Sequence, residues 1–421
     1  MQIKIILNRL EKYRGFVFGK ATICNEYEGN VFGHESLVIE IKPRKNSKAK
    51  CSICHEPCPG YDSLDTRLFE YIPLWGFIVF FAYKMRRVSC KDHGVVVEHV
   101  PWAVGKNHLT TTYGWFLSIW AKRIAWNEVA VIFKTSWHTV YRAIEMAVEW
   151  GLERRDLSNI KSVGIDEIAR QKGHKYLTVV YQIDGYCRRL LWIGRERKEE
   201  TLNGFFDWLG EARSKSIEAI CSDMWKPYLK VIRERAGHVL HVLDRFHIVA
   251  KLNKAIDEVR ADEARKLAQA GKEPVLSKSK WILLKRKDNL TASQGVKLKD
   301  LLKYNLRSVR AYLLKESFAQ LWEYKSVASA KKFMHSWCTE AMRSKIEPMK
   351  KIARMIRSHE ELLLNWFRAK GELSSGIVEG NNTKAKLIIR KSFGFRTENA
   401  LELALYHGLG ELPVPEFTHR Y

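Results

Sequence analysis

The stretch Ser162–Gly185 reads SVGIDEIARQKGHKYLTVVYQIDG, and it decides the fold class. It predicts two β-strands joined by a basic loop, because its second half, Lys175–Ile183, is rich in strand-forming residues. Asp166 falls inside the first strand. A carboxylate in a buried strand is costly unless a hydrogen-bonding partner, a cation or a metal compensates it. Our working hypothesis is that Asp166 is the first metal ligand of a nuclease-like site.

The residues after this pair of strands continue in an order that indicates one fold. We expect a third strand at Arg188–Ile193, a helix near Glu199–Ala212, a fourth strand at Ile217–Cys221 and a fifth at His238–Leu243. Three strands and a helix, followed by strand, helix and strand, is the order of the ribonuclease-H-like fold. In that fold the first and fourth strands lie side by side, so the sequence predicts an α/β catalytic core of this class.

A second carboxylate falls where this fold would bring it beside the first. Asp223 follows the fourth strand, so Asp166 and Asp223 should meet although they lie far apart in the chain. The fifth strand runs into Asp244 and His247, at the start of a long helix.

A third carboxylate lies in Ser374–Arg396, which reads SSGIVEGNNTKAKLIIRKSFGFR and predicts a short helix and loop. Glu379 is in the first helical turn, where the helix dipole tolerates a carboxylate. Its spacing from Asn382 and Lys386 places these residues on one polar stripe. The segment also carries a concentrated basic patch, which we expect to bind DNA: Lys384, Lys386, Arg390, Lys391 and Arg396.

Three carboxylates suit metal-dependent cleavage of a phosphodiester. Two Mg²⁺ ions about 4 Å apart activate a water or a 3′-hydroxyl and stabilise the leaving oxygen, and Mg²⁺ prefers oxygen ligands. We therefore assign Asp166, Asp223 and Glu379 as catalytic ligands of two Mg²⁺ or Mn²⁺ ions. Each acid also has an ordinary structural explanation, as an ion-pair partner, a helix cap or a dipole-compensating residue. The fold order and the overall charge favour the catalytic interpretation.

The charge of the chain favours a polyanionic partner. Its 421 residues contain 72 Lys plus Arg against 47 Asp plus Glu, a net charge of +25. Nucleic acid is the first candidate and an acidic membrane surface the second. The longest apolar run, Pro73–Tyr83, is too short to span a bilayer and reads as a buried strand. The N-terminus lacks the layout of a signal peptide, so we expect a cytoplasmic protein that does not enter a membrane.

Cysteines near the N-terminus predict a structural zinc site. Cys51 and Cys54 have CxxC spacing, and Cys90 and His93 form a second pair with the same spacing. Two such pairs can place four ligands tetrahedrally around Zn²⁺. The alternative ligands in the first segment are Cys58 and His55.

Residues 105–150 change to a helical pattern with a break at Lys134-Thr135, where Thr135 or Ser136 could cap the second helix. A short helix, a tight turn and a second helix is the plan of the helix-turn-helix motif. The second helix would then offer four side chains to a DNA major groove: Trp137, His138, Tyr141 and Arg142. Because the turn lacks the common glycine, an ordinary helical hairpin remains the alternative.

These observations predict five segments, with a small zinc-binding β domain and a helix-turn-helix domain before the core. The zinc-binding domain covers residues 1–104 and the helix-turn-helix domain residues 105–155. The core begins at 156–260, a basic helical insertion interrupts it at 261–370, and 371–421 completes it with Glu379. The loop Arg170–Lys175, ending in Lys175, either contacts DNA backbone or is a solvated hairpin turn.

Several of these segments resemble one family. They are SVGIDEIARQKGHKY, CSDMWKPY, HVLDRFHIV and GIVEGNNTKAKLIIRKSFGFR, together with the N-terminal cysteine pairs and WNEVAVIFKTSWHTVYRA. Their order is similar to that of bacterial insertion-sequence transposases of the ISL-three (ISL3) family. The resemblance implies a DDE transposase whose acids are Asp166, Asp223 and Glu379. Asp244 and His247 match a D-x-x-H motif of several such groups, in which His247 would help orient the scissile phosphate or the strand end.

The resemblance also implies an activity. Such an enzyme binds the terminal inverted repeats of its own element, hydrolyses a phosphodiester at each end and joins the freed 3′-hydroxyl to target DNA. Its partners would be double-stranded DNA and further copies of the chain, as a dimer or larger complex on DNA in the bacterial nucleoid. The alternatives are a DNA-binding regulator that uses the ribonuclease-H-like core as a scaffold and a structure-selective nuclease.

Overall fold

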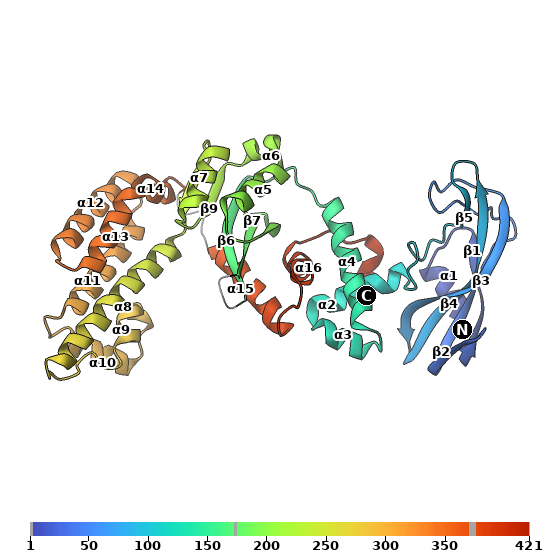
Figure 1. The fold of residues 1–421 in the computed structure, drawn as a ribbon, viewed down its shortest axis with the longest axis horizontal. Coiled ribbons are helices and arrows are strands. Elements are labelled where there is room, and N and C mark those ends of the chain that lie inside the picture. The colour runs from blue at the N-terminus through green and yellow to red at the C-terminus, as the bar shows by residue number, and fades with distance from the viewer. Residues whose placement is uncertain (1–2, 172–174, 370–375, 421) are drawn as a thin grey trace. The chain divides into compact units, whose positions relative to one another are not determined.

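The computed structural model describes residues 3–171, 175–369 and 376–420, without the side chains of Arg170, Gln171, Lys175, His419 and Arg420. The chain divides into two compact units (Figure 1): Met1–Arg155 with Leu387–Tyr421, and Asp156–Lys386. The sequence-based division instead assigned all of 371–421 to the core. Among the described residues, no helix combines the length and the apolar character needed to cross a membrane.

The first unit begins with a β domain. Its elements are α1 (Ile3–Leu10), β1 (Phe16–Tyr27), β2 (Asn30–Pro43), β3 (Gly60–Leu74), β4 (Phe77–Cys90) and β5 (Gly94–Val97). The strands form one sheet in the order β1-β2-β4-β3, with β5 paired to β4. Buried Trp102 packs edge-on against Phe16 and Tyr83 in its core. The predicted strand at 73–83 is interrupted by the β3–β4 turn, where Trp75 is 80% exposed with a φ of 50°.

Helices complete the first unit. They are α2 (Thr111–Arg123), α3 (Trp126–Ile132), α4 (Trp137–Arg154) and α16 (Glu398–Leu409), followed by the short η3 (Glu416–Arg420). Ser136 caps α4 by accepting a hydrogen bond from the Thr139 N–H, as one of the two predicted caps. Ala400 and Ala404 of α16 belong to the same apolar cluster as Ile144 of α4. The C-terminal helix therefore completes the core around α2–α4.

The second unit contains a five-stranded sheet in the order β10-β9-β6-β7-β8. Its strands are β6 (Ser162–Gln171), β7 (Lys175–Asp184), β8 (Cys187–Arg195), β9 (Ala219–Ser222) and β10 (Leu240–Leu243). β6, β7 and β8 are antiparallel, whereas β9 and β10 run parallel to β6. In this register Ala219 of β9 lies between Ser162 of β6 on one side and Leu240 of β10 on the other.

Helices cover both faces of this sheet. Alternate residues of β6 point to opposite faces, so they contact different helices. Val163 and Ile165 pack with the helices α5 (Glu199–Leu209) and α7 (Lys226–Arg235), which α6 (Glu211–Ser216) separates in the chain. Gly164 faces α15 (Gly376–Lys391) instead, and a Cβ on Gly164 would lie 2.3 Å from Val378 Cγ2. A glycine is required at this position for the helix to approach the sheet. Asp166 has the parity of Gly164, so it faces α15.

An all-helical layer lies between β10 and α15 in the chain, and α8 extends from the sheet into it (Figure 1). It contains α8 (Arg245–Gln269), α9 (Lys280–Leu284), η1 (Lys287–Asn289), α10 (Ala292–Leu301), α11 (Arg307–Ala319), η2 (Gln320–Glu323), α12 (Val327–Arg343), α13 (Glu347–Ser358) and α14 (Glu360–Arg368). α8 is the long helix expected after the fifth strand, and the domain boundary expected at residue 261 falls within it.

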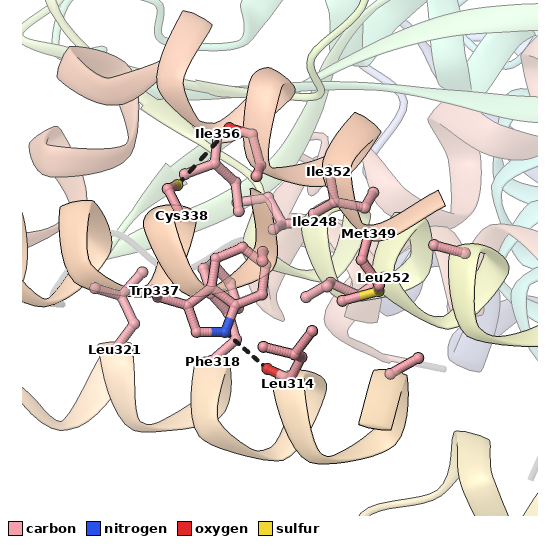
Figure 2. Packing of buried hydrophobic residues seen from close by; sticks show 14 of the residues in the cluster. Ile248, Leu252, Leu314, Phe318, Leu321, Trp337, Cys338, Met349, Ile352 and Ile356 are labelled. Carbon is pink, nitrogen blue, oxygen red and sulfur yellow. Dashed lines mark hydrogen bonds between the residues drawn. The ribbon is translucent and has the colours of Figure 1, made fainter. Parts of the chain in front are cut away.

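The helical layer has an apolar core of its own (Figure 2). Trp337 is 2% exposed and donates its indole N–H to the Leu314 carbonyl at 2.8 Å, which satisfies its one polar atom. Asn365 of α14 donates to the carbonyl of His241 in β10 at 2.7 Å. The layer therefore leaves β10 through α8 and returns to the same strand through α14.

Candidate active site

The register of the parallel strands places three aspartates at one level of the sheet. Gly164 of β6 lies opposite Cys221 of β9, and continuing this register along both strands sets Asp166 opposite Asp223. Leu243 of β10 lies opposite Ser222, so the next step sets Asp244 opposite Asp223. Ligand sites in sheets with parallel strands lie at the carboxyl ends of those strands. The two predicted aspartates therefore follow neighbouring strand positions with Asp244 beside them, although among the described residues the carboxylate oxygens of these acids and the His247 nitrogens do not form a group of three or more within 4.8 Å of one another.

Asp166 is held by hydrogen bonds to both of its carboxylate oxygens. The backbone N–H of Glu167 donates to Oδ1 at 2.8 Å, and the amide of Asn382 donates to Oδ2 at 2.6 Å. Its side chain is only 15% exposed. Burial raises the pKa of Asp166, and the neighbouring charges of Asp244 and Asp223 raise it further. A bound cation would relieve this crowding of negative charge.

His247 lies between two of the acids. Its Nε2 is 3.6 Å from Asp244 Oδ2 and 3.9 Å from Asp166 Oδ1. Asp244 also caps α8 by accepting a hydrogen bond from the Phe246 N–H at 2.7 Å, which fixes the first turn that carries His247. The predicted histidine is thus within reach of the carboxylates.

An arginine that sequence reasoning missed enters the same cluster. Arg197 follows Glu196, whose φ of 73° turns the chain after β8. Its Nη2 donates to Asp223 Oδ2 at 2.8 Å, and its guanidinium stacks 4.4 Å from the ring centre of Trp225. Its Nε faces Glu167 Oε1 at 2.5 Å without the alignment of a hydrogen bond, so we count this contact as an ion pair.

Glu167 is a fourth carboxylate at this edge, and it was not predicted as a site residue. Burial raises the pKa of Glu167 to about 7, and the charge of Asp223 contributes, while Arg197 opposes the shift. In the sequence, the only indication that Glu167 belongs to the site was its position next to Asp166 in the same predicted strand.

Asn382 ties helix α15 to the sheet. Its Oδ1 accepts a hydrogen bond from the Tyr181 hydroxyl at 2.9 Å, while its Nδ2 donates to Asp166. Because an ionised carboxylate only accepts hydrogen bonds, Asp166 fixes the Asn382 amide with Nδ2 toward it, which leaves Oδ1 for the buried Tyr181 hydroxyl. Asn382 belongs to the polar helix face predicted from the sequence, but the helical spacing did not indicate that it would contact Tyr181 and Asp166.

Glu379, the third predicted acid, lies one turn before Asn382. It is exposed in the first turn of α15, and the helical spacing puts it on the same side of the helix as Asn382. The hydrogen bond from α15 to Asp166 comes from Asn382. The structure therefore brings the helix of Glu379 to the aspartates, and Glu379 itself is exposed.

The predicted zinc ligands come together in the β domain. The ligand atoms of Cys51, Cys54, Cys90 and His93 all lie within 4.8 Å of one another, the one such group of three or more among the described residues. Cys54 Sγ is 3.7 Å from Cys90 Sγ, and Cys90 Sγ is 3.5 Å from His93 Nδ1. Tetrahedral zinc with bonds of about 2.3 Å to sulfur separates its ligands by about 3.8 Å.

The helix-turn-helix residues lie at the N-terminal end of α4. Trp137, His138 and Arg142 are exposed, and Tyr141 is half-buried. The rings of Trp137 and Tyr141 stack at 5.4 Å, and Trp126 of α3 packs against both.

The predicted basic residues of α15 and its following loop are exposed: Lys384, Lys386, Arg390, Lys391 and Arg396. Lys384 and Lys386 belong to the second unit, whereas the other three belong to the first. The side chain of Lys175 lies outside the described residues.

The zinc cluster gives a direct prediction. Cys54→Ser should reduce tightly bound zinc from about one ion per chain to almost none, because one of four ligands is lost. Zinc would be measured by mass spectrometry after dialysis against a mild chelator. Cys58→Ser is the control, since Cys58 is in the same segment but outside the group of four. Equal zinc in both variants would contradict the assignment.

The contact of Asn382 gives a second prediction. Asn382→Ala removes the bond to Asp166 and leaves the buried Tyr181 hydroxyl without its acceptor, a loss of about 1–3 kcal/mol. Amide hydrogen exchange in the first two turns of α15 should therefore accelerate by about 5- to 150-fold. Thr383→Ala, at the exposed neighbouring position, should leave exchange unchanged. Equal exchange in the two variants would show that α15 does not depend on this contact.

Comparisons with known proteins agree on one family. A family model for ISL3-type DDE transposases, described as a transposase, matches residues 163–405. The chain is 30% identical to the transposase for insertion sequence element IS1001 of Bordetella parapertussis, over 86% of this chain and 89% of that protein. It is 31% identical to the transposase for insertion sequence element IS1557 of Mycobacterium tuberculosis, over 94% of both chains. The matched region contains the aspartates, Arg197, His247 and Asn382, so the chain belongs to the ISL3 family of insertion-sequence transposases.

Proposed function

We propose that this transposase works by the DDE mechanism on a ribonuclease-H-like core. The support is the topology of the second unit. Three antiparallel strands, β8-β7-β6, continue into the parallel strands β9 and β10, with α5 between β8 and β9 and α7 between β9 and β10. The sequence predicted this succession of strands and helices along the chain, with the first and fourth strands side by side.

Asp166, Asp223 and Glu379 are the proposed ligands of two Mg²⁺ or Mn²⁺ ions. The donor set suits these ions, because it supplies oxygen atoms alone and the two aspartates are only 15% and 11% exposed. When bound, the ions would lower the pKa of a water and stabilise charge on the oxygens of the scissile phosphate. Since Glu379 is exposed, its carboxylate would turn toward the aspartates on metal binding.

The neighbouring side chains prepare this site. Asn382 fixes the orientation of the Asp166 carboxylate through Oδ2. Arg197 balances the charge of Glu167 and Asp223 and would release Asp223 Oδ2 to a metal. His247, 38% exposed beside Asp166, is placed to donate a hydrogen bond to a phosphate oxygen.

The reaction on DNA takes place in two steps. Water attacks the phosphodiester at each end of the element, the bond to the 3′ oxygen breaks, and a 3′-hydroxyl is freed. That hydroxyl then attacks a phosphodiester of target DNA, whose own 3′ oxygen leaves, so no covalent enzyme intermediate forms. The zinc-binding domain and α4 would recognise the terminal inverted repeats, and the exposed lysines and arginines of 384–396 would hold phosphates. Cleavage of two ends requires at least a dimer on DNA.

The observation that carries this proposal is the register that aligns Asp166, Asp223 and Asp244 at one edge of the sheet. A DNA-binding regulator would need the N-terminal modules alone. It would have no use for three aligned acids, together with an arginine and a histidine beside them.

Asp223→Asn should leave binding of an element-end duplex within about twofold and lower Mg²⁺-dependent strand cleavage by at least about 1000-fold, because a metal ligand is lost. Cleavage would be followed on end-labelled DNA. Asp207→Asn is the matched control, since Asp207 is an exposed acid of the same unit paired with Arg235, and surface ion pairs contribute little.

The products of the same assay distinguish the alternatives. Joined products with unlabelled target DNA support a transposase, whereas cleavage without joining indicates a nuclease. Normal cleavage by Asp223→Asn would contradict the proposed site, and an uncleaved but tightly bound end in the parent protein would favour a regulator.

A further inference from the structure

The turn that ends α15 has an unusual residue at its tip. The Phe393 N–H donates to the Arg390 carbonyl and the Gly394 N–H donates to the Ile389 carbonyl, both at 3.0 Å. These are the two hydrogen bonds of the Schellman motif, whose first residue beyond the cap adopts the left-handed conformation and is usually glycine. Here that residue is Phe393, with a φ of 53°, although a glycine follows directly.

Phe393 is unfavourable for the isolated chain in two ways. A left-handed φ is rare for a bulky side chain. The ring is also 100% exposed, so none of its apolar surface is buried by the residues that the structure describes. No described residue covers the ring, so a partner that buried it would offset these costs.

The turn is fixed on both sides of Phe393. Lys391 Nζ donates to the Lys122 carbonyl in the last turn of α2 at 3.3 Å. The ring of Phe395 packs edge-on against Trp126 of α3 at 5.4 Å. Phe393 is therefore presented by an anchored turn.

The anchoring connects the turn to the predicted DNA-reading helix. Trp126, which holds Phe395, also packs against Trp137 and Tyr141 at the start of α4. One aromatic cluster thus joins the turn to the residues expected to reach the major groove.

Three exposed basic residues flank Phe393 in the sequence: Arg390, Lys391 and Arg396. A bare aromatic ring among cations suits nucleic acid, because cations bind phosphates while the ring stacks on a base or enters a base step. An apolar protein surface would not be matched by three positive charges. DNA is therefore the partner whose chemistry fits both features.

We propose that Phe393 stacks on a base of the DNA that the helix-turn-helix domain binds, and so distorts the duplex at one position beside the recognised sequence. The inference rests on the proposed function, because that function supplies the DNA end. It adds a base-stacking site that is separate from the helix-turn-helix contacts and from the carboxylates.

The test uses the full-length protein and duplexes that carry the terminal inverted repeat, with 2-aminopurine placed at successive positions. The parent should change the fluorescence at one or two positions, where a base leaves its stack. Phe393→Ala should abolish that change and weaken binding by about 5- to 100-fold, whereas Phe393→Trp should retain both.

Trp75→Ala is the matched control. Trp75 is also an exposed aromatic residue with a positive φ before a glycine, but Pro73, Leu74, Gly76 and Phe77 beside it carry no charge. This variant should behave as the parent does. An equal loss in Trp75→Ala and Phe393→Ala would contradict a specific stacking site.

Other outcomes separate this inference from the proposed function. If the parent binds the end duplex and Phe393→Ala leaves the fluorescence change intact, the stacking site is wrong and the proposed function stands. If Phe393→Ala reduces self-association without changing the DNA signal, a second copy of the chain covers the ring and the inference is overturned. If the parent does not bind the end duplex, both are overturned.

Discussion

Three carboxylates on neighbouring parallel strands repel one another, and the second unit is arranged around this constraint. Extending the strand register sets Asp166, Asp223 and Asp244 at one level, and because Asp223 and Asp244 are buried and Asp166 is half-buried, water screens their charges weakly. Backbone N–H groups, Asn382 and Arg197 offset part of the repulsion. In the proposed mechanism, divalent cations neutralise the remaining charge and bring a phosphodiester to this edge.

The helical layer does not disturb the edge of the sheet that carries the aspartates, because it folds around an apolar core of its own. It departs from β10 through α8, whose cap is the site residue Asp244, and α14 returns to β10 through Asn365. A long insertion between fixed ends costs little loop entropy when it folds by itself. The sheet can therefore accept the whole run of helices from α8 to α14 between β10 and α15 without losing the alignment of its acids.

Local patterns predicted the succession of strands and helices along the chain and the placement of Asp223 after the fourth strand, because apolar runs define the strands and Asp223 directly follows one. Residue spacing also predicted the cluster of Cys51, Cys54, Cys90 and His93, which is compatible with zinc. Such patterns could not predict which side chains contact the aspartates. Arg197 reaches Asp223 through a left-handed turn at Glu196, and Asn382 reaches Asp166 only after α15 packs on Gly164. The association of α16 with α2–α4 also depends on tertiary contacts, since its apolar face alone does not specify a partner.

The central claim is that the aspartate edge binds the catalytic metal ions, and anomalous scattering from Mn²⁺ in crystals of the protein with its DNA end tests it most directly. We predict anomalous peaks about 2.1 Å from carboxylate oxygens of Asp166 and Asp223, with Arg197 no longer bonded to Asp223 and Glu379 turned toward the metal. Crystals that contain Mn²⁺ and DNA but show no peak at this edge, with Arg197 still paired to Asp223, would contradict the account.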